Sequence, residues 1–310
     1  MRDKYQAAQN CWTALKTQTL PNGRKMSLLD RIKQSIGLRS TPNKAIRLAY
    51  GPEPLQFGDI YLPASSGPHP TIILIHGGYW RARYDLNLMT GLTEDLTAHG
   101  FAAWNIEYRR VGDPGGGWPG TFLDVARAAD HLHIIESTYD LDLERVVPIG
   151  HSAGGHLAFW LAARPRISAG DLLEGTNINE GHAHNGPLIP RGAISLAGVL
   201  DLMLAWRLHL SMDAVVDLLG GTPSDVPERY TSASPAALLP LGIPQVLIHG
   251  TEDVNVPLEV SQSYAEAAKT ANDQVTLIVL PGVDHFDVIN ARSAAWAKTI
   301  EALLDLLAPA

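Results

Sequence analysis

Ser152, Asp253 and His285 are residue types that together can carry out nucleophilic acyl transfer, and they lie at widely separated points of the chain. Ser152 is the centre of Gly150–Gly154, a G-x-S-x-G pattern between an apolar run and a helical pattern. This pattern is typical of a sharp strand-to-helix turn that exposes the serine hydroxyl, with glycines where side chains would collide. The competing interpretations are a glycine-rich turn that only permits close packing, and a dinucleotide fingerprint, whose middle glycine is serine here.

Asp253 and His285 each follow a later apolar run, and their positions predict the roles of acid and base. Asp253 follows Gln245–His249, and His285 follows Val275–Leu280. His285 would take the proton from Ser152 and return it to the leaving group, while Asp253 would hold the imidazole in the required tautomer. The order serine, aspartate, histidine along the chain differs from the orders in chymotrypsin and subtilisin.

Other carboxylates and histidines near these positions have alternative interpretations. The carboxylates that could replace or support the predicted acid are Asp201, Glu252, Asp284 and Asp287. We expect His249 to be buried within a strand, and His151 and His156 to be structural or to line the pocket. His182 and His184 lie in a polar loop with no further ligand pattern, so we do not expect a metal site there.

The loop His76–Trp80 is predicted to stabilise the negative charge that develops during acyl transfer. It follows the apolar run Thr71–Ile75 and contains paired glycines, which let backbone N–H groups turn towards an oxyanion. We expect Gly78 or Tyr79 to supply one N–H and Ala153 to supply another, where the helix dipole also favours negative charge. Losing one such donor typically costs about 3 kcal/mol in the transition state. Taken alone, the His-Gly-Gly tripeptide more often marks an ordinary turn.

The elements that must position these loops alternate along the chain from about residue 55. The short apolar runs are Thr71–His76, Phe101–Tyr108, Val146–Ile149, Ala193–Leu196, Gln245–His249 and Val275–Leu280. The segments with helical spacing are Leu86–His99, Phe122–Thr138, Gly155–Ala163, Leu258–Thr270 and Ala291–Leu307. This alternation predicts a doubly wound α/β domain with a mostly parallel sheet covered on both faces. Ala45–Tyr50 and Pro54–Leu62 could add antiparallel edge strands.

Three segments exceed what such a core requires, and none of them predicts a second domain. Residues 1–50 form a basic extension, in which Ser27–Gly37 is predicted to be a short amphipathic helix that packs on the body or on a second subunit. The α/β domain is predicted over 51–310. Within it, residues 166–190 are a polar excursion and residues 202–240 are a candidate lid.

Composition excludes several other classes of protein. With 45% hydrophobic and 18% charged residues, the chain is not intrinsically disordered, and its single cysteine, Cys11, excludes an internal disulfide. No apolar run approaches the ~20 residues of a membrane-spanning helix. The net charge of −8 combines +8 over residues 1–47 with −16 elsewhere, and an acidic body argues against nucleic-acid binding. Without an apolar signal segment we expect a cytoplasmic protein, although the basic N-terminus leaves a transit peptide open.

Taken together, the motifs resemble those of α/β-hydrolase-fold serine hydrolases in the esterase and lipase group related to hormone-sensitive lipase. Within that group, the sequence is most similar to the kynurenine formamidase-like and carboxylesterase branch. The resemblance covers about residues 50–300 and is carried by His76–Trp80, Glu107–Arg109, Trp118-Pro119, Gly150–His156, Gly198–Asp201, Leu218–Pro223, Ala233–Pro235, Gly250–Pro257 and Asp284-His285. It implies an α/β-hydrolase fold with a small helical lid. Tyr79 stands where lipases have a third glycine, which argues against long-chain lipid substrates.

The leading hypothesis is hydrolysis of a carboxylic ester with a small acyl group through an acyl-enzyme on Ser152. We expect an aromatic pocket for the leaving group, with ordinary core packing as the alternative for each residue: Tyr79, Trp80, Trp118 and Trp206. The second hypothesis is an arylformamide, amide or carbamate substrate, whose amine must be protonated by His285 as it departs. A non-catalytic ligand-binding member of the fold is the third. The chemistry needs no metal and no organic cofactor, its partner is a small-molecule substrate, and a homodimer is left open.

Overall fold

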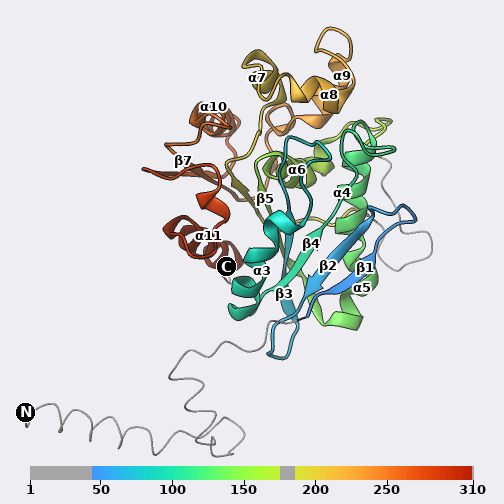
Figure 1. Cartoon of the computed structure of the whole chain (residues 1–310), viewed down its shortest axis with the longest axis vertical. Helices are drawn as coiled ribbons and strands as arrows, with labels where there is room; N and C mark the ends of the chain where they lie inside the picture. Colours follow the sequence, from blue (N-terminus) through green and yellow to red (C-terminus); the bar gives the residue numbers. More distant parts are fainter. Residues whose placement is uncertain (1–43, 175–185, 309–310) are drawn as a thin grey trace, which may run out of the picture. The chain divides into compact units, whose positions relative to one another are not determined.

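The central feature of the computed structural model, which describes residues 44–174 and 186–308, is one sheet (Figure 1). Its eight strands follow the order β1-β2-β4-β3-β5-β6-β7-β8. The bounds are β1 (Ile46–Ala49), β2 (Phe57–Tyr61), β3 (His69–Ile75), β4 (Ala102–Ile106), β5 (Leu141–His151), β6 (Ala193–Leu196), β7 (Gln245–Gly250) and β8 (Val275–Leu280). β1 and β2 pair antiparallel at one edge, and the other strands run parallel. The predicted mostly parallel sheet is confirmed.

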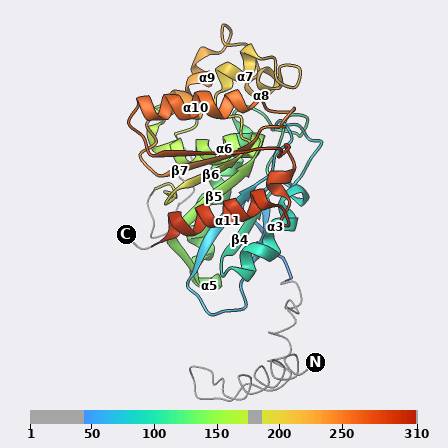
Figure 2. The same cartoon turned by 90° about the vertical axis from the view of Figure 1, so that its left-hand side faces the viewer.

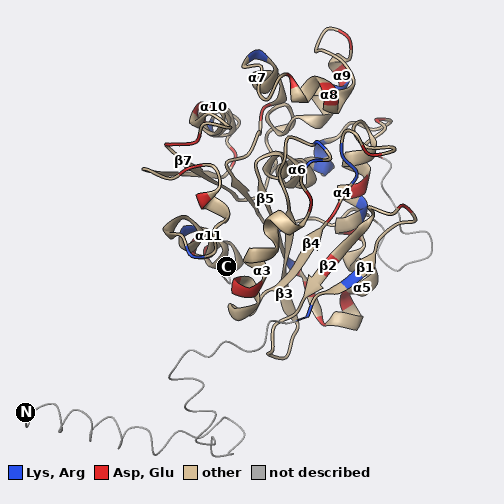
Figure 3. Ribbon diagram, viewed as in Figure 1, with Lys and Arg blue, Asp and Glu red and all other residues tan. Residues whose placement is uncertain are grey.

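The sheet is buried on both faces, which explains why its central strands are almost continuously apolar. In β3, Ile73 and Ile75 belong to one core cluster, whereas Ile72 and Leu74 belong to a second. All four side chains are fully buried. Because successive side chains of a strand point to opposite faces, the two clusters lie on opposite sides of the sheet. Figure 3 shows that Lys, Arg, Asp and Glu lie mostly on helices and loops, as expected for a sheet that is buried on both faces.

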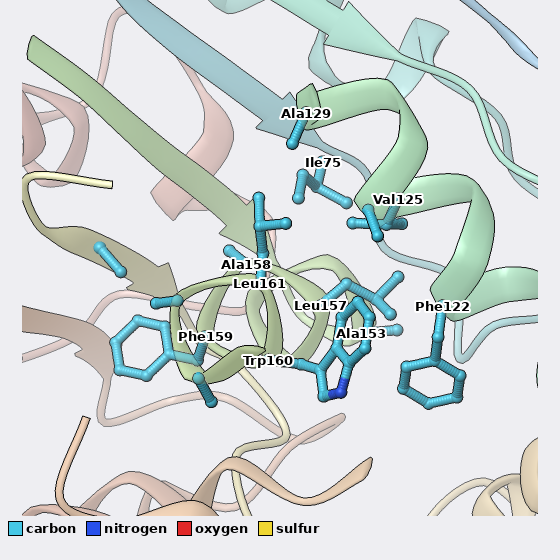
Figure 4. Packing of buried hydrophobic residues seen from close by; sticks show 14 of the residues in the cluster. Ile75, Phe122, Val125, Ala129, Ala153, Leu157, Ala158, Phe159, Trp160 and Leu161 are labelled. Atoms are coloured by element: carbon cyan, nitrogen blue, oxygen red, sulfur yellow. The ribbon is translucent and has the colours of Figure 1, made fainter. Parts of the chain in front are cut away.

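Helices cover both faces of the sheet. The helices with residues in the cluster that contains Ile75 include α4 (Gly120–Asp130), α5 (Leu132–Tyr139), α6 (Ala153–Ala163) and α10 (Leu258–Thr270). The residues of two helices pack in the opposite cluster: α3 (Asn87–Ala98) and α11 (Ala294–Leu307). Figure 2 shows α6 and α10 on one side of the strands and α11 on the other. Figure 4 shows Ile75 beside Val125 and Ala129 of α4, with the side chains of α6 packed next to them.

Residues 202–240, the candidate lid, form short helices that hydrogen bonds tie to the core. They comprise α7 (Leu202–Arg207), α8 (Ala214–Leu219), α9 (Pro227–Ala233) and the 3₁₀ helix η2 (Pro235–Leu238), with α7, α8 and α9 grouped together in Figure 1. The Trp118 backbone N–H donates to the Leu218 carbonyl at 2.8 Å. The Trp160 indole N–H donates to the Ser232 carbonyl at 3.1 Å. These bonds fix the segment in place, and its role as a lid stays a prediction.

The possible edge strand within Ala45–Tyr50 is present, before the predicted start of the domain at residue 51. β1 begins at Ile46 and pairs along its whole length with β2, so the compact unit starts at Lys44. The predicted helix Ser27–Gly37 and Cys11 lie outside the described residues, and so do His182 and His184. The first residue of the excursion, Arg166, is the last residue of the 3₁₀ helix η1 (Arg164–Arg166). Within the described part of the chain, every helix is too short or too polar to cross a membrane.

Candidate active site

Ser152 occupies the turn between β5 and α6, in a backbone conformation that side-chain-bearing residues seldom adopt. Its φ is 56° and its ψ is −119°. Its backbone N–H donates to the Leu196 carbonyl at 2.8 Å, which holds the turn against β6. A Cβ at Gly150 would lie 1.9 Å from the Gly154 carbonyl oxygen, and one at Gly154 would lie 2.0 Å from the Ile75 carbonyl oxygen. Both glycines are therefore required by close packing, as the G-x-S-x-G pattern predicted.

His285 and Asp253 meet because they follow β8 and β7, which are neighbours in the sheet. His285 Nδ1 lies 2.6 Å from Asp253 Oδ2. The other carboxylate oxygen, Oδ1, accepts hydrogen bonds from the backbone N–H groups of Asn255 and Val256, each at 2.8 Å. A carboxylate only accepts hydrogen bonds, so Nδ1 of His285 carries the proton and Nε2 is left with its lone pair.

His249 adds a contact to Asp253 that the sequence did not indicate. His249 is fully buried, as predicted, and its Nε2 lies 2.9 Å from the Val256 carbonyl and 3.2 Å from Asp253 Oδ2. Burial raises the pKa of Asp253, but the hydrogen bonds from His249 and His285 outweigh it and hold that pKa below its ordinary value. Asp253 therefore stays ionised and can stabilise a positive charge on His285.

Ser152 and His285 line the same small cavity, whose volume is about 60 Å³. Its other lining residues are Gly78, Tyr79, Tyr84, Leu88, His151, Asn255 and Phe286. The structure thus brings the three residues predicted to react to one place, together with Gly78 and Tyr79. The sequence analysis did not predict four of the lining residues, which are Tyr84, Leu88, Asn255 and Phe286. Two of these, Asn255 and Phe286, could have been found, because each lies within two positions of Asp253 or His285.

The backbone N–H groups predicted to stabilise the oxyanion belong to Gly78, Tyr79 and Ala153, which lie in the cavity wall or next to Ser152 in the chain. Gly78 has a φ of 115° and Tyr79 a φ of 50°, and neither N–H donates a hydrogen bond to any residue that the structure describes. Ala153 is the first residue of α6, so its N–H has no acceptor within the helix. The Tyr79 hydroxyl donates to the Asn255 carbonyl at 2.5 Å. Burial, with a smaller effect of Asp253, raises the pKa of Tyr79 to about 12, which keeps this donor protonated.

His76, at the start of the same loop, is a structural residue. Its Nε2 lies 3.0 Å from Glu107 Oε1, and its ring stacks on Tyr108 with 4.4 Å between centroids. Glu107 Oε2 accepts from the Leu86 backbone N–H at 3.1 Å. The Tyr108 hydroxyl donates to the His76 carbonyl at 2.8 Å. These contacts explain why the glutamate and tyrosine after β4 accompany the His-Gly-Gly motif.

Three of the four residues predicted to form the pocket lie elsewhere. Tyr79 lines the cavity, but Trp80 is only 1% exposed and packs in the core. Trp118 packs edge-on against Phe122 with 5.6 Å between ring centroids. Trp206 is partly buried against the same apolar cluster and does not line the cavity. Large aromatic rings on loops are drawn into the core because burying them stabilises the fold more than exposure at a cleft.

The alternative carboxylates shape turns instead of facing His285. Asp201 caps α7 by accepting from the Met203 backbone N–H at 2.9 Å. Asp284 accepts from the Asp287 backbone N–H at 2.9 Å, and Glu252 is exposed. Among the described residues, no group of three or more His, Cys, Asp or Glu side chains could hold a metal ion.

The sequence model of the BD-FAE family matches residues 58–267, which is more than half of the chain. The chain belongs to the BD-FAE family. This places it among the hormone-sensitive-lipase-like α/β-hydrolases, so the resemblance inferred from the motifs is confirmed.

Some curated relatives of this BD-FAE member are named esterases, and another is named a formamidase. Esterase LipC of Mycobacterium tuberculosis is 27% identical, over 84% of this chain and 64% of LipC. A probable isoprenylcysteine alpha-carbonyl methylesterase, ICMEL1 of Arabidopsis thaliana, is 26% identical, over 78% of this chain and 50% of that protein. Kynurenine formamidase avaC of Aspergillus versicolor is 27% identical, over 75% of this chain and 86% of avaC. The chain thus spans only half to two thirds of the first two relatives.

Solved structures show the same fold. A truncated carbohydrate esterase from gut microbiota superposes with a TM-score of 0.71 at 21% identity, over 86% of this chain and 97% of that one. Esterase Est2 of Thermogutta terrifontis gives a TM-score of 0.67 at 24% identity, over 86% of this chain and 94% of that one. The α/β-hydrolase fold predicted for this BD-FAE member is therefore confirmed.

Proposed function

We propose that this protein hydrolyses carboxylic esters with a small acyl group through an acyl-enzyme on Ser152. The observation that carries the proposal is the 2.6 Å contact between His285 Nδ1 and Asp253 Oδ2, at a cavity that His285 shares with Ser152. The names of the esterase relatives support the same class of reaction.

In the proposed mechanism, His285 Nε2 removes the proton from the Ser152 hydroxyl as its oxygen attacks the ester carbonyl. Asp253 stabilises the imidazolium that forms. The backbone N–H groups of Ala153 and of Gly78 or Tyr79 donate to the developing oxyanion. Collapse of the tetrahedral intermediate expels the alcohol, which takes the proton from His285, and water then cleaves the acyl-enzyme by the same steps.

The size of the cavity supports a small acyl group. Its volume of about 60 Å³ and its aromatic and aliphatic walls, which include Tyr84, Leu88 and Phe286, suit a formyl or acetyl group better than a lipid chain. Tyr79, whose hydroxyl donates to the Asn255 carbonyl, also stands where lipases have a third glycine.

A formamide or related amide is the second candidate substrate class. The kynurenine formamidase avaC supports it, because this chain covers 86% of that relative. The combination of Tyr79 and Trp80 after the paired glycines supports it too. The two candidates differ in the leaving group, since an amine must be protonated by His285 before it departs. The ratio of kcat/KM for phenyl acetate to that for N-formylaniline decides between them, because both substrates have one small acyl group and one phenyl ring.

Replacement of the nucleophile tests both candidates together. Ser152→Ala should abolish turnover of p-nitrophenyl acetate and labelling by a fluorophosphonate probe. Ser224→Ala is the matched control, since Ser224 is exposed and should leave both signals unchanged. Turnover retained in Ser152→Ala would show that another group is the nucleophile.

A further inference from the structure

The segment that carries the predicted oxyanion donors has an unfavourable backbone conformation. The φ angles of Gly78, Tyr79 and Trp80 are 115°, 50° and 55°. Two consecutive residues with side chains therefore occupy the left-handed region, which their Cβ atoms disfavour. Such a conformation persists only where surrounding contacts hold it. The contacts that hold this segment are therefore part of what aims its N–H groups.

Trp80 is held from the interior of the protein. Its indole N–H donates to His156 Nδ1 at 3.1 Å, and the two rings meet edge-on with 5.2 Å between centroids. Its backbone carbonyl accepts from the Val111 N–H at 2.7 Å. The indole is only 1% exposed, so a lost partner inside the protein cannot be replaced by water.

His156 is suited to accept this hydrogen bond. It lies in the first turn of α6, four residues after Ser152, and it is fully buried. Its Nε2 lies 2.9 Å from the Ala233 carbonyl in α9, which can only accept. Nε2 therefore carries the proton, and Nδ1 has a lone pair for Trp80. Burial lowers the pKa of His156 to about 4, so this tautomer persists at neutral pH.

We infer that His156 is a positioning residue, which holds the oxyanion loop through Trp80 and so aims the N–H groups of Gly78 and Tyr79 beside Ser152. The inference rests on the proposed hydrolase function. His156 does not line the cavity and does not touch the reacting atoms, so it acts only through Trp80. It connects the helix that follows the nucleophile with the loop that receives the oxyanion.

Trp160 supplies a matched control for this role. It lies one turn further along α6, it is fully buried, and its indole N–H donates to the Ser232 carbonyl at 3.1 Å. His156 and Trp160 therefore both tie α6 to α9, and of these two His156 is the one that accepts the hydrogen bond of the Trp80 indole. An effect that comes from anchoring α9 should appear in both variants, whereas an effect on the oxyanion loop should appear only for His156.

The test measures kcat and KM for p-nitrophenyl acetate in four single variants and one double variant. His156→Leu removes both hydrogen bonds, Trp80→Phe removes only the indole N–H, and His156→Gln retains one acceptor and one donor. We expect kcat to fall tenfold to a hundredfold in His156→Leu and Trp80→Phe, with KM within about twofold. His156→Gln should recover kcat to within about threefold, and Trp160→Phe should keep it. The double variant of Trp80→Phe and His156→Leu should lose no more than the worse single variant, because both changes break the same Trp80–His156 hydrogen bond.

A second measurement separates this inference from the proposed function. Hydrogen exchange of the backbone amides over residues 76–84 should be faster in His156→Leu and Trp80→Phe than in Trp160→Phe, whatever the substrate. Failure of the proposed function would appear as wild-type protein without hydrolysis or as activity in Ser152→Ala. The positioning role is overturned if His156→Leu keeps both wild-type kcat and wild-type exchange, or if Trp160→Phe loses as much as His156→Leu.

Discussion

The loop that carries Asp253 and the loop that carries Gly78 and Tyr79 approach the same cavity, but they are held in different ways. Asp253 is fixed by backbone N–H groups two and three residues further along its own loop, each at 2.8 Å. The Tyr79 hydroxyl instead reaches Asn255, 176 residues away in sequence, and the Trp80 indole reaches His156, 76 residues away. The acid is thus positioned locally, whereas the oxyanion loop depends on remote side chains.

This contrast predicts which substitutions should disturb each loop. A locally held carboxylate tolerates changes elsewhere in the fold, because its donors are backbone groups that every residue except proline supplies. A remotely held loop can be disturbed from α6 or from the framework around Glu107, far from the reacting atoms.

The largest effect is expected at the acid itself. Asp253→Asn should lower kcat for p-nitrophenyl acetate by about 10⁴-fold, because an amide favours the wrong tautomer of His285. The adjacent Glu252→Gln is the control, since Glu252 is exposed and should change kcat less than twofold. A loss below tenfold in Asp253→Asn would mean that another carboxylate, such as Asp284, serves His285.

The next effect concerns the buried framework of the oxyanion loop. Glu107→Leu removes the acceptor of His76 Nε2 and of the Leu86 N–H. Leaving these buried donors unpaired should lower the free energy of unfolding by about 3 kcal/mol, as measured by urea denaturation. The exposed Glu301→Gln should change it by less than about 0.5 kcal/mol. Equal effects of the two variants would contradict a structural role for Glu107.

Low pH should lower the stability of the protein through His156, which anchors the oxyanion loop. Burial lowers the pKa of His156 from 6.5 to about 4, partly opposed by the hydrogen bond to Ala233. Below pH 6.5 the unfolded chain binds a proton that the folded protein does not, so stability falls as the pH drops towards 4. For this one group the loss is about 2 kcal/mol at pH 5. His156→Gln removes the titration.

Urea denaturation at pH 7 and pH 5 measures this effect. The loss of stability between the two pH values should be smaller in His156→Gln than in the wild type. Burial, with a smaller effect of the neighbouring His285, also lowers the pKa of His151, to about 3, so part of the pH dependence should remain in the variant. Identical pH dependence in both proteins would show that His156 is not held neutral.

The smallest effect is expected from the connection between the two loops. Tyr79→Phe removes only the hydroxyl that donates to the Asn255 carbonyl. Because Trp80 still anchors the loop, we expect kcat to fall no more than about tenfold, with KM nearly unchanged. Tyr139→Phe, on α5, is the control and should leave kcat at its wild-type value. A loss in Tyr79→Phe as large as that in Asp253→Asn would make this hydroxyl a direct participant in the reaction.

Much of the fold could be predicted because strands and turns depend on local pattern. Ala193–Leu196 and Val275–Leu280 are strands with the predicted bounds. The predicted helix Phe122–Thr138 is instead two helices that meet at His131, a break that the helical spacing does not show. Ala45–Tyr50 could be predicted only as a possible edge strand, because Ile46–Ala49 is mostly exposed and its pairing with β2 makes it a strand.

By itself, the sequence determined the sheet, the turn at Ser152 and the order of the three residues proposed to react, because alternation and close-packed glycines leave a local signature. Only the tertiary structure decided which aromatic side chains face the cavity. Trp80 turns inwards because its partner, His156, lies on α6, and Tyr79 stays at the cavity because the Asn255 carbonyl holds its hydroxyl. Such contacts depend on the packing of distant elements, which no spacing within one motif records.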